Sequence, residues 1–374
     1  MKRLLRTVFL IFFGFVIVLN FIHCKRDVNE VKIGVIMPLT GGAAVYGVPS
    51  LNAIRLAVEK FENVSNQKDV KIKLVAEDSQ ANPAMGVTAI QKLIDVNRVK
   101  VILGPLASGV TLAVAPIAEK KKNLILSPSS SAPAITNAGA YIFRTELSDL
   151  QGGVAQADLA IDKLSFKKIA CVYINNDYGA SLIEVFKKRF EEKGGVIAFK
   201  EGFPQGATDF KTILSKITTA EIDAIFVISH DEILNFVRQK AEIGIHVPIY
   251  TTPVFEDQRN LEKLGSLANG IIYTYYGEFD PNSDKKIIKE FIQAYQSKYG
   301  EPPSYYAALA YDATNILLKA LEMSNFKIEK LKDVLAETRN FIGVTGKMSF
   351  DKNGDILKPV SLKFVKDGKF LFYK

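Results

Sequence analysis

Short apolar runs alternate with longer amphipathic segments along most of the chain. Residues 31–38 are almost wholly apolar, and residues 70–75 alternate apolar and polar positions. These runs predict β-strands, whereas apolar residues at helical spacing over 51–58 predict a helix. Asn82 followed by Pro83 predicts the start of another helix, because asparagine caps with proline at the first helical position are typical there.

The same rhythm continues and restarts near residue 168. In the first half we predict strands at 99–103 and 123–126 and a helix at 111–119. In the second half the predicted strands are 168–174, 196–200, 223–228, 248–251 and 270–275, and the predicted helices are 179–193, 208–218, 231–243 and 258–265. This alternation predicts parallel sheets with right-handed crossovers, arranged as two doubly wound α/β lobes with a first crossing at 146–151.

The last part of the chain has a different character. Helical patterns at 284–299, 304–323 and 327–338 are followed by two strand patterns, 346–350 and 360–373. An Asn-Gly pair lies between these strands, and we expect the two to form an antiparallel hairpin. A chain that returns to each lobe in this way would cross between them more than once, which makes a hinge.

The N-terminal segment is typical of an export signal. Three basic residues within the first six precede an uninterrupted run of apolar residues and glycine from Val8 to Leu19. This run is shorter than the ~20 apolar residues that span a bilayer comfortably. We therefore expect residues 1–23 to be a signal peptide and the remainder to be exported.

Cys24 lies where bacterial lipoproteins carry their lipid-attachment cysteine. In that class a leucine usually stands three positions before the cysteine and a small residue directly before it, whereas Phe21 and His23 stand here. We expect lipidation at Cys24, with residues 24–30 as a tether; simple cleavage and an uncleaved anchor are the alternatives. Cys171 lies within a predicted strand, where a lone thiol is a small core hydrophobe.

The composition excludes several classes of protein. Of 374 residues, 48% are apolar and 24% charged, a balance that fits neither a disordered chain nor a multi-span membrane protein. A net charge of +8 over this length is weak evidence for nucleic-acid binding. Two cysteines cannot make a disulfide scaffold or a zinc ribbon.

Sequence motifs for common chemistries are missing. No glycine-rich dinucleotide fingerprint follows the first strand, and the chain holds no Walker A, H-E-x-x-H or C-x-x-C motif. Beyond the signal segment only His230 and His246 remain, so a histidine-dependent triad or metal centre has few parts. We expect no enzyme activity, no cofactor and no metal.

Small polar residues follow three predicted strands of the first lobe. The turns are Leu39–Gly47, Gly104–Gly109 and Ser127–Ser131. Ligands of open α/β sheets bind beyond the carboxyl ends of the strands. Glycines let the backbone approach a ligand, N–H groups at helix starts favour a carboxylate, and serine hydroxyls add donors. Each turn alone is also an ordinary cap, but three at one sheet edge favour a binding cleft.

Several motifs, taken in order, resemble the substrate-binding proteins of branched-chain amino acid ABC transporters, which have the type I periplasmic binding fold. The resemblance runs from Ile33 to the C-terminus. The motifs are residues 33–36, Thr40-Gly41, Gly104-Pro105, residues 125–129, Arg144-Thr145, residues 176–179, residues 307–313 and residues 343–346. It implies two Rossmann-like lobes joined by a three-crossing hinge, with a small ligand trapped between them. The implied lobes are 31–148 with 277–342, and 149–276 with 343–374.

The resemblance also implies site residues in the first lobe. Ser108 would offer its hydroxyl and backbone N–H to a ligand carboxylate, and the Ser131 hydroxyl would serve the same group. Ser129 occupies the position whose carbonyl takes the ligand ammonium.

Three further positions carry over to the hinge and to both walls of the cleft. Tyr46 and Tyr178 would line the cleft, one from each lobe. Asp149, near the first crossing, would help hold the amine.

This sequence departs from the family pattern in the second lobe. The acid that pairs with the ligand ammonium in leucine-binding members aligns with Pro253 or Val254, and Glu256 slightly downstream is the candidate replacement. His230 stands at an aromatic position, either as a ligand contact or as an exposed residue that opens a helix. Three tyrosines could close the cleft or pack around the hinge: Tyr275, Tyr276 and Tyr306.

The leading hypothesis is an exported, membrane-anchored periplasmic protein that binds an amino acid or similar small polar ligand for an ABC importer. It would act as a monomer with an inner-membrane permease as its partner. A sensory lipoprotein that signals to a membrane partner through the same cleft is the alternative. An enzyme on a two-lobed scaffold, such as a nucleotide-using synthetase, lacks a phosphate loop and an acid–base cluster.

Overall fold

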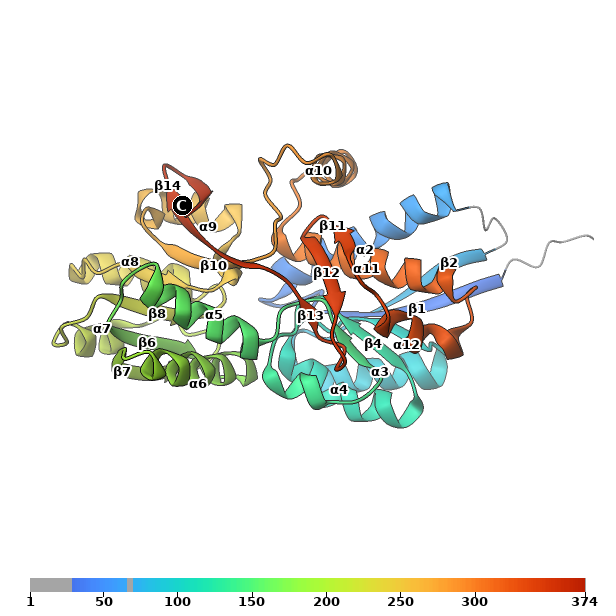
Figure 1. The fold of residues 1–374 in the computed structure, drawn as a ribbon, viewed down its shortest axis with the longest axis horizontal. Helices are drawn as coiled ribbons and strands as arrows, with labels where there is room; N and C mark the ends of the chain where they lie inside the picture. Colours follow the sequence, from blue (N-terminus) through green and yellow to red (C-terminus); the bar gives the residue numbers. More distant parts are fainter. Residues whose placement is uncertain (1–28, 66–69, 374) are drawn as a thin grey trace, which may run out of the picture.

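The computed structural model describes residues 29–65 and 70–373. The predicted signal peptide at residues 1–23 and the predicted lipid attachment at Cys24 lie outside the described residues. The chain forms two α/β lobes side by side (Figure 1), as the alternating pattern predicts.

The first lobe is built on a five-stranded parallel sheet in the order β2-β1-β3-β4-β5. Its strands are β1 (Asn29–Met37), β2 (Val70–Asp78), β3 (Val101–Leu103), β4 (Leu124–Ser127) and β5 (Ile142–Arg144). Its helices are α2 (Ala44–Val64), α3 (Pro83–Gln91) and α4 (Ser108–Lys121), with the short helices η1 (Lys92–Val96) and η2 (Pro133–Asn137). Asn82 caps α3 as predicted, because its side chain accepts from two backbone N–H groups of the first turn.

Both faces of this sheet are covered, which explains the near-continuous apolar run of β1. Ile33, Val35 and Met37 belong to the apolar cluster shared with α2, whereas Ile36 belongs to the cluster shared with α3 and α4. The alternation follows from the two-residue period of a strand.

The second lobe is built on a seven-stranded sheet in the order β15-β14-β10-β9-β8-β6-β7. Its strands are β6 (Lys168–Ile174), β7 (Val196–Phe203), β8 (Ala224–Ile228), β9 (Ile249–Thr251), β10 (Ile272–Tyr276), β14 (Val360–Lys366) and β15 (Lys369–Phe372). Its helices are α5 (Asp149–Asp162), α6 (Asp177–Glu192), α7 (Lys211–Ile217), α8 (Ile233–Ile243) and α9 (Gln258–Leu264), with η3 (Pro253–Phe255) and η4 (Gly265–Ala268). Cys171 is fully buried in β6, which confirms its interpretation as a core residue.

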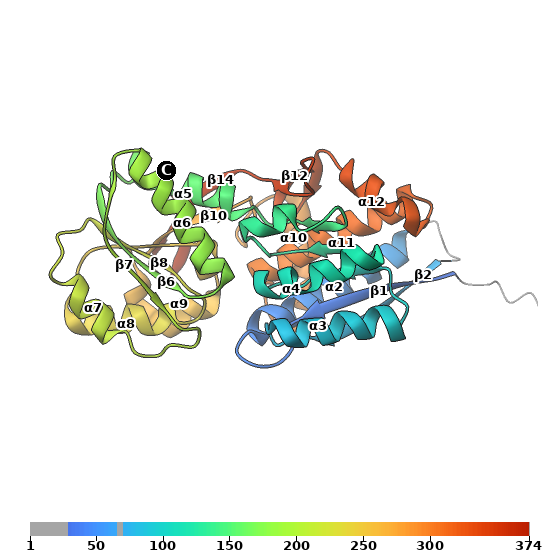
Figure 2. The same ribbon diagram turned by 90° about the horizontal axis from the view of Figure 1, so that it is seen from below.

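The chain returns to the first lobe after β10. The returning elements are α10 (Lys286–Tyr299), α11 (Tyr305–Met323), α12 (Ile328–Ala336), β11 (Phe341–Gly343), β12 (Gly346–Phe350) and β13 (Ile356–Leu357). Helix α11 packs along α2 of the first lobe (Figure 1), on the face of the sheet opposite α3 and α4, which lie in front in Figure 2. Strands β11, β12 and β13 form a small antiparallel sheet of their own.

The predicted pairing of residues 346–350 with 360–373 is wrong. β12 pairs with β13 across the turn that holds Asn353-Gly354, whereas β14 pairs with β10 and β15 in the other lobe. The run 360–373 is itself divided by a turn at Asp367-Gly368. The turn signal was therefore right, but apolar periodicity does not choose a strand's partner.

The segments between the two large sheets are 145–148, 277–285 and 358–359. Arg144 of β5 pairs with Asp355, at 2.6 Å between Nε and Oδ1, and both side chains are buried. Phe350 of β12 packs edge-on against Phe143. Because these contacts tie residues 343–357 to the first lobe, we place the third crossing at 358–359 rather than at 342–343.

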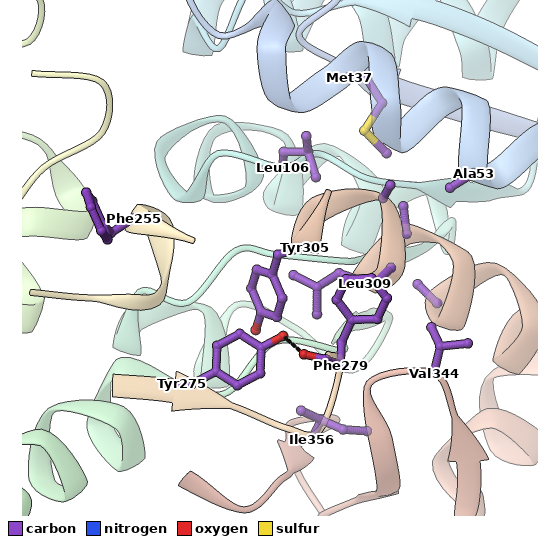
Figure 3. Close-up of a cluster of buried hydrophobic side chains, with 14 of the residues drawn as sticks. Met37, Ala53, Leu106, Phe255, Tyr275, Phe279, Tyr305, Leu309, Val344 and Ile356 are labelled. Atoms are coloured by element: carbon purple, nitrogen blue, oxygen red, sulfur yellow. Dashed lines mark hydrogen bonds between the residues drawn. The ribbon is translucent and has the colours of Figure 1, made fainter. Parts of the chain in front are cut away.

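One cluster of buried apolar side chains contains residues of both lobes and of the segments next to the crossings (Figure 3). Tyr275 packs against Tyr305, and the Tyr275 hydroxyl donates to the Phe279 carbonyl at 2.6 Å. Tyr275 is fully buried, so it packs at the hinge and does not line the cleft.

Candidate ligand-binding cleft

A cavity of about 490 Å³ lies between the lobes, where the carboxyl ends of both sheets meet. This is the edge at which open α/β sheets place their ligands. Turns after β1, β3 and β4 line it from one side, and turns after β6, β7, β8 and β9 line it from the other. The structure brings these residues selected from the sequence to this cavity: Tyr46, Ser108, Ser129, Ser131, Asp149, Tyr178 and His230.

Ser108 is the first residue of α4, and no side chain caps this helix start. N–H groups of the first helical turn therefore remain for an anion, and the helix dipole favours one there. The Ser108 Oγ accepts from the backbone N–H groups of Ser131 and Ala132, each at 3.2 Å. Because both acceptor positions are used, the hydroxyl proton is left to donate to a ligand.

Asp149 faces the same cavity from the start of α5. The Ser131 hydroxyl donates to its Oδ2 at 3.1 Å, and the side chain is almost fully buried. Burial raises the pKa of Asp149 to about 8, against the opposing effects of the Ser131 hydrogen bond and the Arg144 charge. A ligand ammonium at this position would stabilise the charged carboxylate.

The backbone carbonyl of Ser129 is the second hydrogen-bond acceptor of this part of the cavity. The Ser129 hydroxyl donates to the Leu106 carbonyl at 3.0 Å, so the side chain is held within the first lobe. Among the described residues, none donates a hydrogen bond to the Ser129 carbonyl. The cavity thus offers donors at Ser108 and acceptors at Ser129 and Asp149, the pair of functions that a zwitterion needs.

Aromatic rings form much of the remaining wall. His230 stacks on Tyr178 with ring centres 5.6 Å apart, and Tyr46 lies 6.1 Å from His230 and 4.7 Å from Tyr306. Burial lowers the pKa of His230, so the imidazole is neutral at neutral pH. Its Nδ1 atom is buried and has no hydrogen-bond partner among the described residues.

Direct contacts join the two lobes at the mouth of the cleft. The Tyr46 hydroxyl donates to Asp231 Oδ1 at 2.6 Å, and Arg259 Nη2 donates to the Val45 carbonyl at 3.1 Å. Asp177 of α6 approaches Gly109 of α4 so closely that a Cβ on Gly109 would lie 2.7 Å from its carboxylate. The structure therefore shows a closed cleft.

The sequence-based assignment of Glu256 to the ligand site is corrected by its surroundings. Glu256 does not line the cavity; it pairs with Lys363 Nζ at 2.6 Å and accepts from the Tyr273 hydroxyl at 2.7 Å. Lys363 lies on β14, the strand whose partner the sequence pattern misplaced. A buried carboxylate needs such partners, so we leave Glu256 out of the proposed site.

Sequence reasoning missed several residues of the cavity. Glu146 lines it from the first crossing, accepts from the Tyr305 hydroxyl at 2.9 Å, and has its pKa raised by burial. On the second-lobe side it missed Asn176, Asp177, Gln205, Thr208, Asp231, Glu232 and Asn235. Their position just after strands β6, β7 and β8 was the available signal, because the same rule selected the first-lobe turns.

Two kinds of feature are absent from residues 29–65 and 70–373. No helix there is long and apolar enough to cross a membrane. No group of three or more His, Cys, Asp or Glu side chains there is placed to hold a metal ion.

Comparison with known proteins points to one family. The family model described as periplasmic binding protein matches residues 30–368. A leucine-, isoleucine-, valine-, threonine- and alanine-binding protein of Pseudomonas aeruginosa is 26% identical over 348 residues, with 92% of each chain covered.

Solved structures agree with this family. A leucine-binding protein from Thermotoga maritima is 30% identical with a TM-score of 0.85, over 92% of this chain and 98% of that one. A solute-binding protein of an ABC transporter from Rhodopseudomonas palustris, solved with 3,4-dihydroxybenzoic acid, is 27% identical with a TM-score of 0.82, over 92% of this chain and 96% of that one. The chain therefore belongs to the periplasmic binding protein family and has the type I fold of its branched-chain amino acid binding members.

Proposed function

We propose that this protein is the exported solute-binding component of an ABC importer and that it traps a free amino acid between its lobes. The relatives named above bind solutes, two of them amino acids, and the family is periplasmic. The observation that carries the proposal is that one cavity brings together the donors of Ser108 and the start of α4 with the acceptors of Ser129 and Asp149.

The ligand would bind the closed conformation of the two lobes more tightly than the open one. A ligand that touches both lobes favours the closed form, in which Tyr46 meets Asp231 and Arg259 meets the Val45 carbonyl. The closed form would present one continuous surface to a membrane permease. No covalent step is needed, which agrees with a binding protein rather than an enzyme.

The test is calorimetry with the L-amino acids, followed by two derivatives of the tightest ligand. N-acetylation removes the ammonium, and amidation of the carboxylate removes the negative charge. Each derivative should bind at least about 10-fold more weakly, because hydrogen bonds to charged groups contribute roughly 1.5–3 kcal/mol. Equal binding of the derivatives would contradict the proposal.

An aromatic acid is the second candidate ligand. The cavity is lined by five tyrosines and His230, and the Rhodopseudomonas palustris relative was solved with 3,4-dihydroxybenzoic acid. Such a ligand needs the donors at Ser108 and does not need Asp149. Tighter binding of 3,4-dihydroxybenzoate than of any amino acid would favour this candidate.

A further inference from the structure

The second-lobe wall of the cleft is polar where a branched aliphatic ligand would need an apolar surface. The wall residues Asn176, Asp177, Gln205, Thr208, His230 and Asn235 carry amide, carboxyl, hydroxyl or imidazole groups. Ala207, Pro253 and Val254 supply small aliphatic groups, and the rings of Tyr178 and Tyr276 supply aromatic surface. An aliphatic side chain against this wall would remove water from polar groups without replacing their hydrogen bonds, which is costly.

The titratable side chains that line the cavity are equally one-sided. Among the residues that the structure describes, its lining includes five carboxyl groups, those of Glu146, Asp149, Asp177, Asp231 and Glu232, and no lysine or arginine. Lys358 lies near Glu146, and Arg259 lies near Asp231, both outside the lining.

Two of these carboxyl groups lie on the second-lobe wall without a basic partner. Within the described part of the chain, no lysine or arginine forms an ion pair with Asp177 or Glu232. Glu232 accepts from the backbone N–H groups of Gly206 and His230, at 2.8 and 3.0 Å. Each carboxylate oxygen can accept more than one hydrogen bond, so Asp177 and Glu232 keep acceptor positions for N–H groups of a ligand.

His230 adds an unused hydrogen-bonding atom to the same wall. Its ring is held by stacking on Tyr178, and its buried Nδ1 has no partner among the described residues. A neutral imidazole has one donating and one accepting nitrogen, and His230 lines the cavity, so its ring can hydrogen-bond a polar group of the ligand.

We propose that the ligand is an amino acid whose side chain ends in N–H donors, rather than leucine, isoleucine or valine. The α-ammonium and α-carboxylate lie against Asp149 and Ser108, and the tail lies against His230, Asn235 and Asp177. Ammonium, guanidinium and amide tails share this chemistry. The inference rests on the proposed function, because it uses the same zwitterion site.

The first experiment is calorimetric titration of the exported chain with L-leucine, L-isoleucine, L-valine, L-lysine, L-arginine and L-glutamine under identical conditions. At least one donor-tailed amino acid should bind 10-fold or more tightly than leucine. A preference for lysine or arginine over glutamine assigns a cationic tail, and the reverse assigns an amide tail. Tightest binding of leucine, isoleucine or valine would overturn this inference and leave the proposed function standing, whereas binding of no amino acid would overturn both.

Two variants test the wall itself. Asn235→Leu and His230→Phe should weaken the donor-tailed ligand at least 10-fold and leave leucine binding unweakened. Gln293→Leu, on an exposed position of α10 away from the cavity, is the matched control and should change neither affinity. Unfolding midpoints confirm that each variant folds. Equal losses for both ligands would show that these side chains only support the fold, which would overturn their assignment.

Discussion

At the residue scale, the hydroxyl of Ser108 has two roles, one in ligand binding and one in the stability of the neighbouring turn. The Ser108 Oγ accepts two backbone N–H groups of the neighbouring turn, and its proton is left for the ligand. Ser108→Ala should weaken ligand binding about 10- to 100-fold, because a hydrogen bond to a charged group contributes roughly 1.5–3 kcal/mol.

The same substitution should also lower the free energy of unfolding. The N–H groups of Ser131 and Ala132 would lose their acceptor, at a cost of about 1–3 kcal/mol for a buried unsatisfied group. Calorimetry and urea unfolding measure the two effects separately. Ser297→Ala, exposed on α10, is the control for both. Unchanged affinity in Ser108→Ala would remove Ser108 from the site.

The raised pKa of Asp149 makes the stability of the unliganded protein depend on pH. Burial raises this pKa from the ordinary value of 3.8 to about 8. Between these two pH values the folded protein therefore holds a proton that the unfolded chain has released. The contribution of Asp149 to stability is therefore present at low pH and is lost as the pH rises through this window. Asp149→Asn should flatten that decrease, as unfolding free energies between pH 5 and about pH 8 would show.

Binding of an ammonium at Asp149 should expel its proton. At about pH 7 most of the unliganded protein carries this proton, whereas the ligand selects the charged carboxylate. Calorimetry in buffers of different ionisation enthalpy should detect up to about one proton released per ligand, and none in Asp149→Asn. Binding by the wild-type protein without proton release would contradict the proposed ammonium contact.

At the scale of elements, Glu256 illustrates how strand pairing decides the role of a side chain. Near the cleft turn after β9, it resembled a replacement for a missing acid, but β14 brings Lys363 beside it. Glu256→Ala should lower the free energy of unfolding by about 3–5 kcal/mol, because it leaves a buried lysine unpaired. Ligand affinity should stay unchanged.

A double variant separates charge from packing at this position. Glu256→Leu combined with Lys363→Met removes both charges, so it should be more stable than Glu256→Ala alone. Chemical unfolding of the three proteins measures the difference. A loss of ligand affinity in Glu256→Ala at unchanged stability would return Glu256 to the binding site.

Elements with a strong pattern were predictable, whereas several with a weak pattern, among them β5 and α5, were not. Strand β5 has three residues, and α5 contains Gly152 and Gly153, which are poor helix formers. Glycine is required at 152 by packing, since a Cβ there would lie 2.4 Å from the Tyr276 hydroxyl. The tertiary contact thus overrides local propensity in the very helix that positions Asp149.

At the scale of the whole molecule, the contacts at the cleft mouth predict a conformational change. Tyr46→Phe removes the bond to Asp231 and should weaken ligand binding about 2- to 10-fold, since the pair is exposed and such bonds contribute roughly 0.5–1.5 kcal/mol. The loss should lie mainly in a faster dissociation rate, because the bond forms only in the closed state.

X-ray scattering measures the closure directly. A saturating ligand should reduce the radius of gyration of the wild-type protein, because the lobes move together around the three crossings. Tyr46→Phe should need more ligand to reach the same compact form. Identical scattering curves with and without ligand would count against hinge closure.

The amino-acid sequence by itself determined the two α/β lobes, the order of nearly all their elements and the first-lobe half of the cleft. These features follow from periodicity, caps and turns, which act between residues close in the chain. The tertiary structure alone decided that β14 joins β10, that Glu256 pairs with Lys363, and which second-lobe side chains face the ligand. Such features depend on which distant segments meet, and burial then sets the partners and the pKa of each group.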